Sequence, residues 1–329
     1  MDRKVCIKME FEMPVLYSII VPVYNSEQSI PILYKQLVEV FHEMDKNFEI
    51  IFIDDSSKDH SYEVMKELYC NNSNVKIVQL SKNFGQHKAI ICGLSFADGE
   101  FIITMDDDLQ HPPAEIPKMI NAIQNHPEID VVIGSYDTKK HNFIRNLGTY
   151  AMNFVSSYIF KRDSKIKLTS FRLMRRFVAQ ALLDADTVTP RIGSMILQVT
   201  NRIMNVKIHH EQRIYGHSGY PFRQLMKDFL NNILNNSDLP LKLVGKIGIV
   251  SFICSITMIL YYIILYFVRG ISIQGWTTLV ILILLFFGIT LFSVGLIGSY
   301  MIRIMAEAKN MPLYVVRDAK TDGNGRNCQ

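Results

Sequence analysis

The sequence predicts an α/β fold with a mainly parallel sheet, followed by a hairpin of two transmembrane helices. Over residues 17–136, short runs rich in β-branched residues alternate with helical stretches. The short runs are almost continuously apolar, as expected for parallel strands that helices cover on both faces. Two later segments, 247–268 and 270–302, contain no charged residue. A helix of roughly 20 residues is long enough to cross a bilayer, so each segment can hold one span.

The strands and helices follow one another in a regular order. Apolar runs bounded by turn residues predict strands at 17–24, 48–55, 75–80, 101–107 and 130–136. Helical periodicity predicts helices at 28–44, 59–72, 86–97, 113–126, 142–160, 174–184 and 191–204, with a strand-like stretch at 206–216. Since helices join successive strands, right-handed crossovers are expected. The carboxyl ends of the strands then share one edge, where open α/β sheets bind ligands.

The last third of the chain predicts membrane attachment. An amphipathic juxtamembrane helix is expected within 221–240, where it either packs on the globular domain or lies in the lipid interface. Two transmembrane helices are expected at about 247–268 and 276–301, inside the segment 243–304. The basic residues that flank the outer ends of this hairpin are Lys242, Lys246, Arg303, Lys309 and Arg317.

These basic residues set the predicted orientation. The positive-inside rule places the globular domain, residues 17–220, in the cytoplasm together with the N-terminal tail 1–16 and the C-terminal tail 305–329. The polar residues that follow Arg317 predict a disordered end. Small residues in the second span permit close helix contacts in a homo-oligomer, namely Gly288, Ser293, Gly295 and Gly298.

Two classes of binding protein are excluded. The net charge of +4 is mild, and no basic run carries interleaved aromatic residues, so nucleic acid is not an expected partner. The turn after the first strand reads VPVYNSEQS and contains no glycine. A dinucleotide-binding fingerprint would have three glycines there, and no phosphate-binding glycine loop with its lysine occurs elsewhere.

Acidic residues at the strand ends predict a metal site instead. Asp54 and Asp55 end the second strand, and Asp106, Asp107 and Asp108 end the fourth. Like charges this close repel one another, so a cation is expected among them. Carboxylates separated by one residue can hold Mg²⁺ or Mn²⁺, which in turn binds a diphosphate. The alternative is that these acids cap the helix that begins at Pro112–Pro113, but a cap needs one acid rather than three.

Six ordered motifs carry a resemblance to a known family: VPVYN, IDDSSKD, SKNFGQHKAI, DDDLQHPP, TSFRLM and QRIYGHSGY. Together they resemble the family 2 glycosyltransferases of GT-A fold. Within that family the chain looks like the polyisoprenyl-phosphate hexosyltransferases, a branch that includes dolichol-phosphate mannose synthases and bactoprenol glucosyltransferases. The match covers residues 17 to about 236, and the C-terminal hairpin is similar to that of the bacterial members.

The resemblance implies a role for each matching residue. Asp106, Asp108 and Gln110 would hold the metal, and Asp106, Asp108 and Arg145 would be catalytic. The acceptor phosphate would meet Arg145, Thr149, Arg213 and Ser218. The nucleotide-sugar would be bound by Pro22, Tyr24, Asn25, Asp54, Asp55, Lys82, Gly85, Gln86 and Asp107.

Two positions depart from the family pattern. Ser26 stands where glutamate commonly follows the first asparagine, and Tyr136 stands where arginine commonly follows the Gly-Ser of the fifth strand. If that arginine contacts the lipid phosphate, Lys139 or Lys140 has to replace it, or acceptor binding is altered. Asp107 occupies a position that is usually small in relatives.

The implied activity is hexose transfer with inversion, from a nucleoside-diphosphate sugar to undecaprenyl or related polyprenyl phosphate. The donor expected is UDP-linked, and the enzyme would lie in the bacterial plasma membrane and modify cell-envelope glycans or lipids. Two alternatives stay open: a glycosyltransferase that acts on a glycan or protein, and a non-enzymatic membrane scaffold that binds nucleotide-sugars. A processive polysaccharide synthase would carry a Gln-x-x-Arg-Trp motif, whereas the single tryptophan here, Trp276, lies at the predicted membrane interface.

Overall fold

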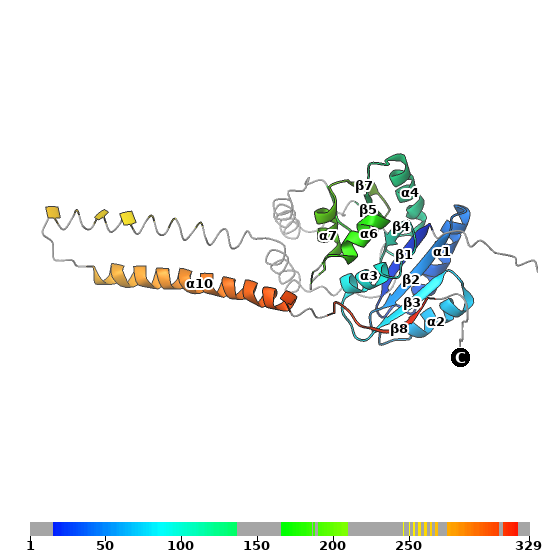
Figure 1. The fold of residues 1–329 in the computed structure, drawn as a ribbon, viewed down its shortest axis with the longest axis horizontal. Helices are drawn as coiled ribbons and strands as arrows, with labels where there is room; N and C mark the ends of the chain where they lie inside the picture. Colours follow the sequence, from blue (N-terminus) through cyan, green and yellow to red (C-terminus); the bar gives the residue numbers. More distant parts are fainter. Residues whose placement is uncertain are drawn as a thin grey trace, which may run out of the picture. The chain divides into compact units, whose positions relative to one another are not determined.

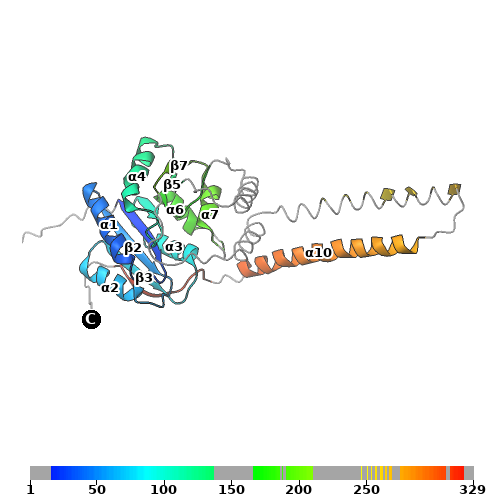
Figure 2. The same ribbon diagram turned by 180° about the vertical axis from the view of Figure 1, so that it is seen from behind.

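The computed structural model describes residues 16–136, 166–185, 187, 190–209, 275–308 and 312–321, with single positions between 246 and 268. The chain divides into two compact units. The first contains residues 1–218 together with 312–329, and the second contains residues 219–311. Figures 1 and 2 show the first unit as a sheet with helices on both faces.

The first unit is built on one eight-stranded sheet with the order β7-β5-β6-β4-β1-β2-β3-β8. The strands are β1 (Tyr17–Val23), β2 (Phe48–Asp54), β3 (Val75–Leu80), β4 (Phe101–Thr104), β5 (Val131–Ser135), β6 (Arg172–Arg175), β7 (Ile203–Lys207) and β8 (Val316–Lys320). β1 pairs in parallel with β2 and β4, β2 with β3, and β5 with β7. Only β6 and β8 among these strands run antiparallel to their neighbours. The predicted α/β fold with a mainly parallel sheet is confirmed.

Helices cover the two faces of this sheet. Their bounds are α1 (Ile30–Glu43), α2 (Ser61–Asn71), α3 (Gln86–Leu94), the short 3₁₀ helix η1 (Pro113–Glu115), α4 (Ile116–Asn125), α6 (Arg176–Leu183) and α7 (Ile192–Val199). Side chains alternate along β1, so that Ile19 and Val21 pack with α1, α2 and α4, whereas Ile20 packs with α3, α6 and α7. Each face therefore has its own apolar core, and the strands between are buried on both sides.

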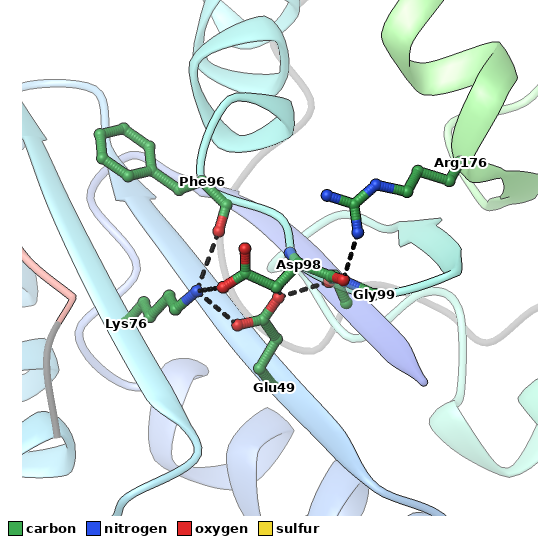
Figure 3. Close-up of polar contacts among 7 residues, drawn as sticks. Glu49, Lys76, Phe96, Asp98, Gly99 and Arg176 are labelled. Carbon is green, nitrogen blue, oxygen red and sulfur yellow. Dashed lines mark hydrogen bonds and ion pairs between the residues drawn. The ribbon is translucent and has the colours of Figure 1, made fainter. Parts of the chain in front are cut away.

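The amino ends of the strands are joined by a buried polar network (Figure 3). Lys76 on β3 forms an ion pair with Glu49 on β2 at 2.7 Å and donates to the Phe96 carbonyl at 3.0 Å. Glu49 also accepts from the Ser18 hydroxyl at 2.5 Å and from the Asp98 amide at 2.7 Å. This network lies at the edge of the sheet opposite to the carboxyl ends, so it belongs to the scaffold rather than to the site.

Residues 316–320 form the strand β8, so the predicted disorder after Arg317 is wrong for residues 318–320. β8 pairs antiparallel with β3, and the Ser81 amide donates to the Val315 carbonyl at 2.9 Å. Leu313, Tyr314 and Val316 pack against the apolar core on the α3 side. Without β8 the edge of β3 would be open, and unpaired strand edges are avoided in stable sheets. Residues 312–321 are thus part of the first unit although they follow the second in sequence.

A hydrogen bond between α2 and β8 gives a test of this strand. The Tyr62 hydroxyl donates to the Asp318 carboxylate at 2.6 Å, and burial together with Asp318 raises the pKa of Tyr62. A hydrogen bond to a charged group contributes roughly 1.5–3 kcal/mol, so Tyr62→Phe should lower the thermal unfolding midpoint of the full chain by a few degrees. Differential scanning fluorimetry in detergent measures the change. Asp318→Asn should lower the midpoint similarly, whereas Arg317→Ala at the exposed neighbouring position should leave it unchanged; equal midpoints for all variants would contradict the role of β8.

The described part of the second unit contains one continuous long helix, α10 (Trp276–Ala308). The first predicted span, 247–268, lies largely outside the described residues, as does the amphipathic helix 221–240. Within the part of the chain that the structure describes, no helix combines the length and the hydropathy needed to cross a membrane. The predicted transmembrane hairpin therefore stays a prediction.

Candidate active site

Polar residues from three strand ends meet at the carboxyl edge of the sheet, around a cavity of about 170 Å³. The cavity is lined by Pro22, Val23, Tyr24, Asp55, Gln86, Asp106, Asp107 and Asp108. All of these except Val23 are among the predicted donor- or metal-binding residues. The parallel arrangement of β1, β2 and β4 brings them together, because parallel strands end at the same edge.

The carboxylate of Asp106 is held from two sides. Ser170 stands two residues before the start of β6, and its hydroxyl donates to Oδ2 at 2.5 Å. The side-chain amide of Gln86, at the start of α3, donates to Oδ1. Burial and the nearby Asp108 raise the pKa of Asp106, while Ser170, His111 and Arg172 act in the opposite direction. Its orientation is therefore fixed before any ligand binds.

Asp107 joins the acidic loop to the first strand. Its carboxylate accepts from the Tyr24 amide at 3.3 Å, and Ser26 also bonds it. Burial, with the charges of Asp106 and Asp108, raises the pKa of Asp107 to about 6. Asp107 thus connects the loop after β4 to the loop after β1, while its predicted contact with the nucleotide-sugar stays a prediction.

The raised pKa predicts a pH dependence of stability. An aspartate whose pKa is higher in the folded state binds its proton more tightly there. The free energy of unfolding therefore rises as the pH falls from about 7 toward about 4, the pKa of aspartate in the unfolded chain. Metal-free protein should therefore show a higher unfolding midpoint at pH 5.5 than at pH 7.5. Asp107→Asn should raise the midpoint at pH 7.5 and reduce its dependence on pH, measured by scanning fluorimetry with a chelator present. A midpoint for Asp107→Asn below that of the wild type at pH 7.5 would contradict this explanation.

Asp106, Asp108 and His111 form a candidate metal centre. Each offers one ligand atom, and these atoms lie within 4.8 Å of one another. Two carboxylate oxygens and an imidazole nitrogen suit Mn²⁺ well and also accept Mg²⁺. The ring of His111 packs against Phe171 and Tyr136, with centroids 5.5 and 6.1 Å apart. The residues present therefore fit the divalent ion that the sequence predicted.

His111 was missed as a metal-ligand candidate, and Gln110 was predicted in its place. The described contact of Gln110 at this site is through its backbone, whose amide donates to the Asp108 carboxylate at 3.1 Å. Leu109 adopts a left-handed conformation with φ of 60° and reverses the chain, which returns His111 toward the two aspartates. The metal-ligand role of Gln110 stays a prediction.

Asp54 and Asp55 organise the neighbouring loops. Asp54 is completely buried and accepts from the Ser57 amide at 2.9 Å and from the Gln79 side chain at 3.1 Å. Asp55 accepts from the backbone amides of Phe84 and Gly85, at 2.7 and 2.8 Å, and burial raises its pKa. Gly85 has a φ of 92°, which side chains rarely tolerate. The Asp55 carboxylate thus shapes the loop that leads into α3, while a direct contact with the nucleotide stays a prediction.

Asn25 and Lys82 lie beside the cavity rather than in its lining. The Asn25 side-chain oxygen accepts from the Lys58 backbone amide at 2.8 Å, and the Asn25 backbone amide donates to the Ser57 hydroxyl at 3.0 Å. Lys82 lies over the Phe84 ring at 5.1 Å. Burial raises the pKa of Tyr136, and the nearby charges of Asp106 and Asp108 raise it further. The ring of Tyr136 thus lies beside the candidate metal centre.

The predicted acceptor residues cannot be placed in the same way. Arg145, Thr149, Arg213 and Ser218 lie outside the described residues, as do Lys139 and Lys140. Their contact with the acceptor phosphate stays a prediction.

Comparison with known proteins agrees with the site. The family model described as "Glycosyl transferase family 2" matches residues 18–183. An uncharacterized glycosyltransferase, YkcC, of Bacillus subtilis (strain 168) is 34% identical over 304 residues, which are 92% of this chain and 93% of the relative. An undecaprenyl-phosphate 4-deoxy-4-formamido-L-arabinose transferase of Proteus mirabilis (strain HI4320) is 27% identical over 303 residues, covering 91% of this chain and 92% of the relative.

Among solved structures, glucosyl-3-phosphoglycerate synthase from Mycobacterium tuberculosis, in complex with Mn²⁺, UDP and glucosyl-3-phosphoglycerate, superposes with a TM-score of 0.49. It is 16% identical, and the match covers 67% of this chain and 78% of that one. The family model covers half of the chain, and the Bacillus relative matches over nine-tenths of it. The chain belongs to glycosyl transferase family 2, and it is a glycosyltransferase.

Proposed function

We propose that this glycosyltransferase moves a hexose from a UDP-linked donor to a polyprenyl phosphate, with inversion at the anomeric carbon. The observation that carries the proposal is the cluster of Asp106, Asp108 and His111, whose ligand atoms lie within 4.8 Å of one another beside an acid-lined cavity. An enzyme that binds a nucleoside diphosphate through a divalent ion needs such oxygen and nitrogen ligands at the carboxyl edge of its sheet. The lipid acceptor is supported by the relative from Proteus mirabilis, whose name specifies undecaprenyl phosphate.

The donor would lie in the cavity with its diphosphate toward Asp106 and Asp108. A divalent ion bound there would neutralise the leaving diphosphate. Gln86 and Ser170 hold the Asp106 carboxylate in one orientation, and Asp107 holds the loop against Tyr24. The side chains on this edge therefore need no rearrangement to receive the donor. In many enzymes, preorganised charge makes the largest single contribution to stabilising the transition state.

The acceptor would need positioning rather than activation. A phosphate monoester is ionised at neutral pH, so its oxygen can attack the anomeric carbon without a strong general base. In-line attack opposite the leaving diphosphate inverts the anomeric centre. The charge-free segments 247–268 and 270–302 support attachment to the bacterial plasma membrane, with the first unit on the cytoplasmic side. There the enzyme and the lipid phosphate would share one plane, which raises their effective concentration.

The test is a transfer assay with the purified full chain in detergent. Mn²⁺, undecaprenyl phosphate and a panel of labelled UDP-hexoses are supplied, and the product is extracted as a lipid. One UDP-hexose should yield a charged glycolipid whose anomeric configuration, read by NMR, is opposite to that of the donor. Donor hydrolysis without lipid product would favour a binding scaffold, and transfer only to added glycan or protein would favour the other open alternative; both outcomes contradict the lipid acceptor.

A further inference from the structure

Arg172 on β6 projects to the face of the sheet that α3, α6 and α7 cover, like Met174 two residues on, and its charge acts on Asp106. Arg172, the first residue of β6, is two residues beyond Ser170. His87 follows Gln86 in the first turn of α3. Ser170 and Gln86 both donate to the Asp106 carboxylate. Arg172 and His87 each follow one of these two donors closely in the sequence.

Arg172 is buried without a full set of partners. Its residue is 5% exposed, and Nε and Nη1 have no hydrogen-bond partner among the described residues. Burial lowers the pKa of Arg172 to about 10, while Asp106 acts to raise it. A buried guanidinium normally binds a carboxylate or phosphate through two or more donors, because an unpaired buried charge is strongly destabilising. Two free donors on a guanidinium indicate that an anion completes the group.

Two helix starts add to this positive region. Nη2 of Arg172 lies 3.9 Å from the point that a Cβ on Gly193 would occupy, so the guanidinium is directed at the first turn of α7. Arg191 immediately precedes α7. Neither α3 nor α7 has an acidic residue in its first turn or a side chain that caps its amides. Helix starts carry partial positive charge and unpaired amides, which favour an anion there.

His87 reports the same local charge independently. Its Nδ1 is buried and has no hydrogen-bond partner in the described part of the chain. Burial, Arg172 and Arg191 lower its pKa to about 4, so the ring is neutral at physiological pH and can donate or accept a hydrogen bond. The ring can therefore offer a hydrogen bond to a ligand at Arg172 without adding charge to the region.

We propose that Arg172, His87 and the first turn of α7 form a binding site for the phosphate monoester of the lipid acceptor. This rests on the proposed function. The donor cavity is lined by four carboxylates and, among the described residues, by no basic side chain, so it offers the acceptor phosphate no counter-charge. Arg172, whose charge acts on Asp106, supplies that counter-charge. Arg172 is thus a second contact for the acceptor phosphate, separate from the residues that the family resemblance implies.

The test compares Arg172→Met and Arg172→Lys with Arg202→Met, which removes an exposed arginine remote from this group. In the transfer assay, Arg172→Met should raise the KM for undecaprenyl phosphate by about tenfold or more, as expected for the loss of a charge-assisted hydrogen bond. The KM for the UDP-hexose should stay within about twofold, and lysine should recover part of the acceptor affinity because it retains the charge. Arg202→Met should match the wild type. An unchanged acceptor KM in Arg172→Met would overturn the proposal.

A binding arm separates this proposal from the proposed function. Undecaprenyl phosphate, undecaprenol and inorganic phosphate are each titrated into full-length protein loaded with Mn²⁺ and UDP, and calorimetry follows binding. The wild type should bind undecaprenyl phosphate in preference to undecaprenol, and Arg172→Met should lose that preference even if no sugar is ever transferred. Equal binding of undecaprenyl phosphate to wild type and Arg172→Met would overturn the site, and so would tight binding of inorganic phosphate that does not compete with the lipid.

Stability distinguishes an anion site from a structural counter-charge for Asp106. Removing an unpaired buried charge should leave the unfolding midpoint of the ligand-free protein unchanged or raise it. A marked fall in the midpoint of Arg172→Met, together with weaker Mn²⁺–UDP binding, would instead assign Arg172 to the support of the metal centre and overturn the proposal.

Discussion

Replacement of Asp108 by alanine is expected to abolish glycosyl transfer, with kcat lowered by roughly a thousandfold or more. The carboxylate is one of three groups whose ligand atoms lie within 4.8 Å of one another, and the adjacent Asp107 is not among the three. Asp107 cannot replace it, because its carboxylate accepts from the Tyr24 amide. Loss of Asp108 therefore removes charge where the leaving diphosphate would be neutralised. Turnover of labelled UDP-hexose to glycolipid measures the effect.

The matched control is Asp184→Ala. Asp184 is an exposed aspartate whose described side-chain contact is with Gln180, on the same helix end. Its replacement should leave turnover and the unfolding midpoint unchanged. Asp108→Ala should keep a folded structure, because the carboxylate has one described backbone donor, the Gln110 amide. Calorimetry with Mn²⁺ and UDP should show weakened binding; full turnover in Asp108→Ala would disprove the metal centre.

The central sheet could be predicted because its strands are apolar on both faces. The runs that form β1, β2 and β3 are mostly apolar, and their observed bounds lie within one residue of the predicted ones. The acids after β2 and β4 then had to meet at one edge, because all these strands are parallel. This part of the fold and of the site depends on local pattern and on the geometry of parallel sheets alone.

The strands β6 and β8, which were not predicted, and β7, which was predicted at other bounds, depend on long-range pairing. β8 reads VRDAK, a mainly polar sequence whose composition by itself indicates disorder. Its pairing with the otherwise open edge of β3 makes it a strand. β6 reads RLMR and overlaps a predicted helix, yet it pairs with both β4 and β5. β7 was expected at 206–216 and is found at 203–207, where it pairs with β5. Tertiary contacts override local propensity in each case.

The same reason explains the missed site residue. His111 stands in the segment that precedes η1, where sequence pattern predicts the start of a helix. Its return to Asp106 and Asp108 depends on the left-handed conformation of Leu109, which a bulky residue rarely adopts and which no local pattern indicates. Three loops at this edge contain such a residue, namely Asn25, Ser56 and Leu109. Strained backbone is concentrated where the site is built.

Replacement of Lys76 by methionine is expected to cause the largest loss of stability, about 3 kcal/mol or more. The side chains of Lys76 and Glu49 are 16% and 5% exposed, and their ion pair is 2.7 Å long. The two carboxylates of Glu49 and Asp98 raise the pKa of Lys76 despite its burial. Removing the ammonium group leaves Glu49 charged and buried, with only the Ser18 hydroxyl and the Asp98 amide as donors. Denaturant unfolding of the full chain, monitored by fluorescence, measures the loss.

A double-mutant cycle separates the ion pair from simple packing. Glu49→Gln keeps an oxygen that can accept from Ser18 and Asp98 but removes the charge, so the double variant Glu49→Gln with Lys76→Met should be clearly more stable than Lys76→Met alone. If packing of the lysine stem were the main contribution, the two changes would add, and the double variant would be the least stable.

The position of the network also predicts what Lys76→Met will not change. Glu49 and Lys76 lie near the amino ends of β2 and β3, and Asp98 lies in the turn before β4 (Figure 3). Ser18 lies near the amino end of β1, whereas the donor cavity is at the carboxyl ends of the same strands. Gly99 fixes this turn, since a Cβ there would lie 2.7 Å from the Ser18 amide nitrogen. Below the unfolding transition, the KM for the UDP-hexose and kcat should therefore equal those of the wild type. A raised donor KM in a folded Lys76→Met protein would show that the two edges of the sheet are coupled, and would contradict the separation of scaffold and site on which the assignment of this network depends.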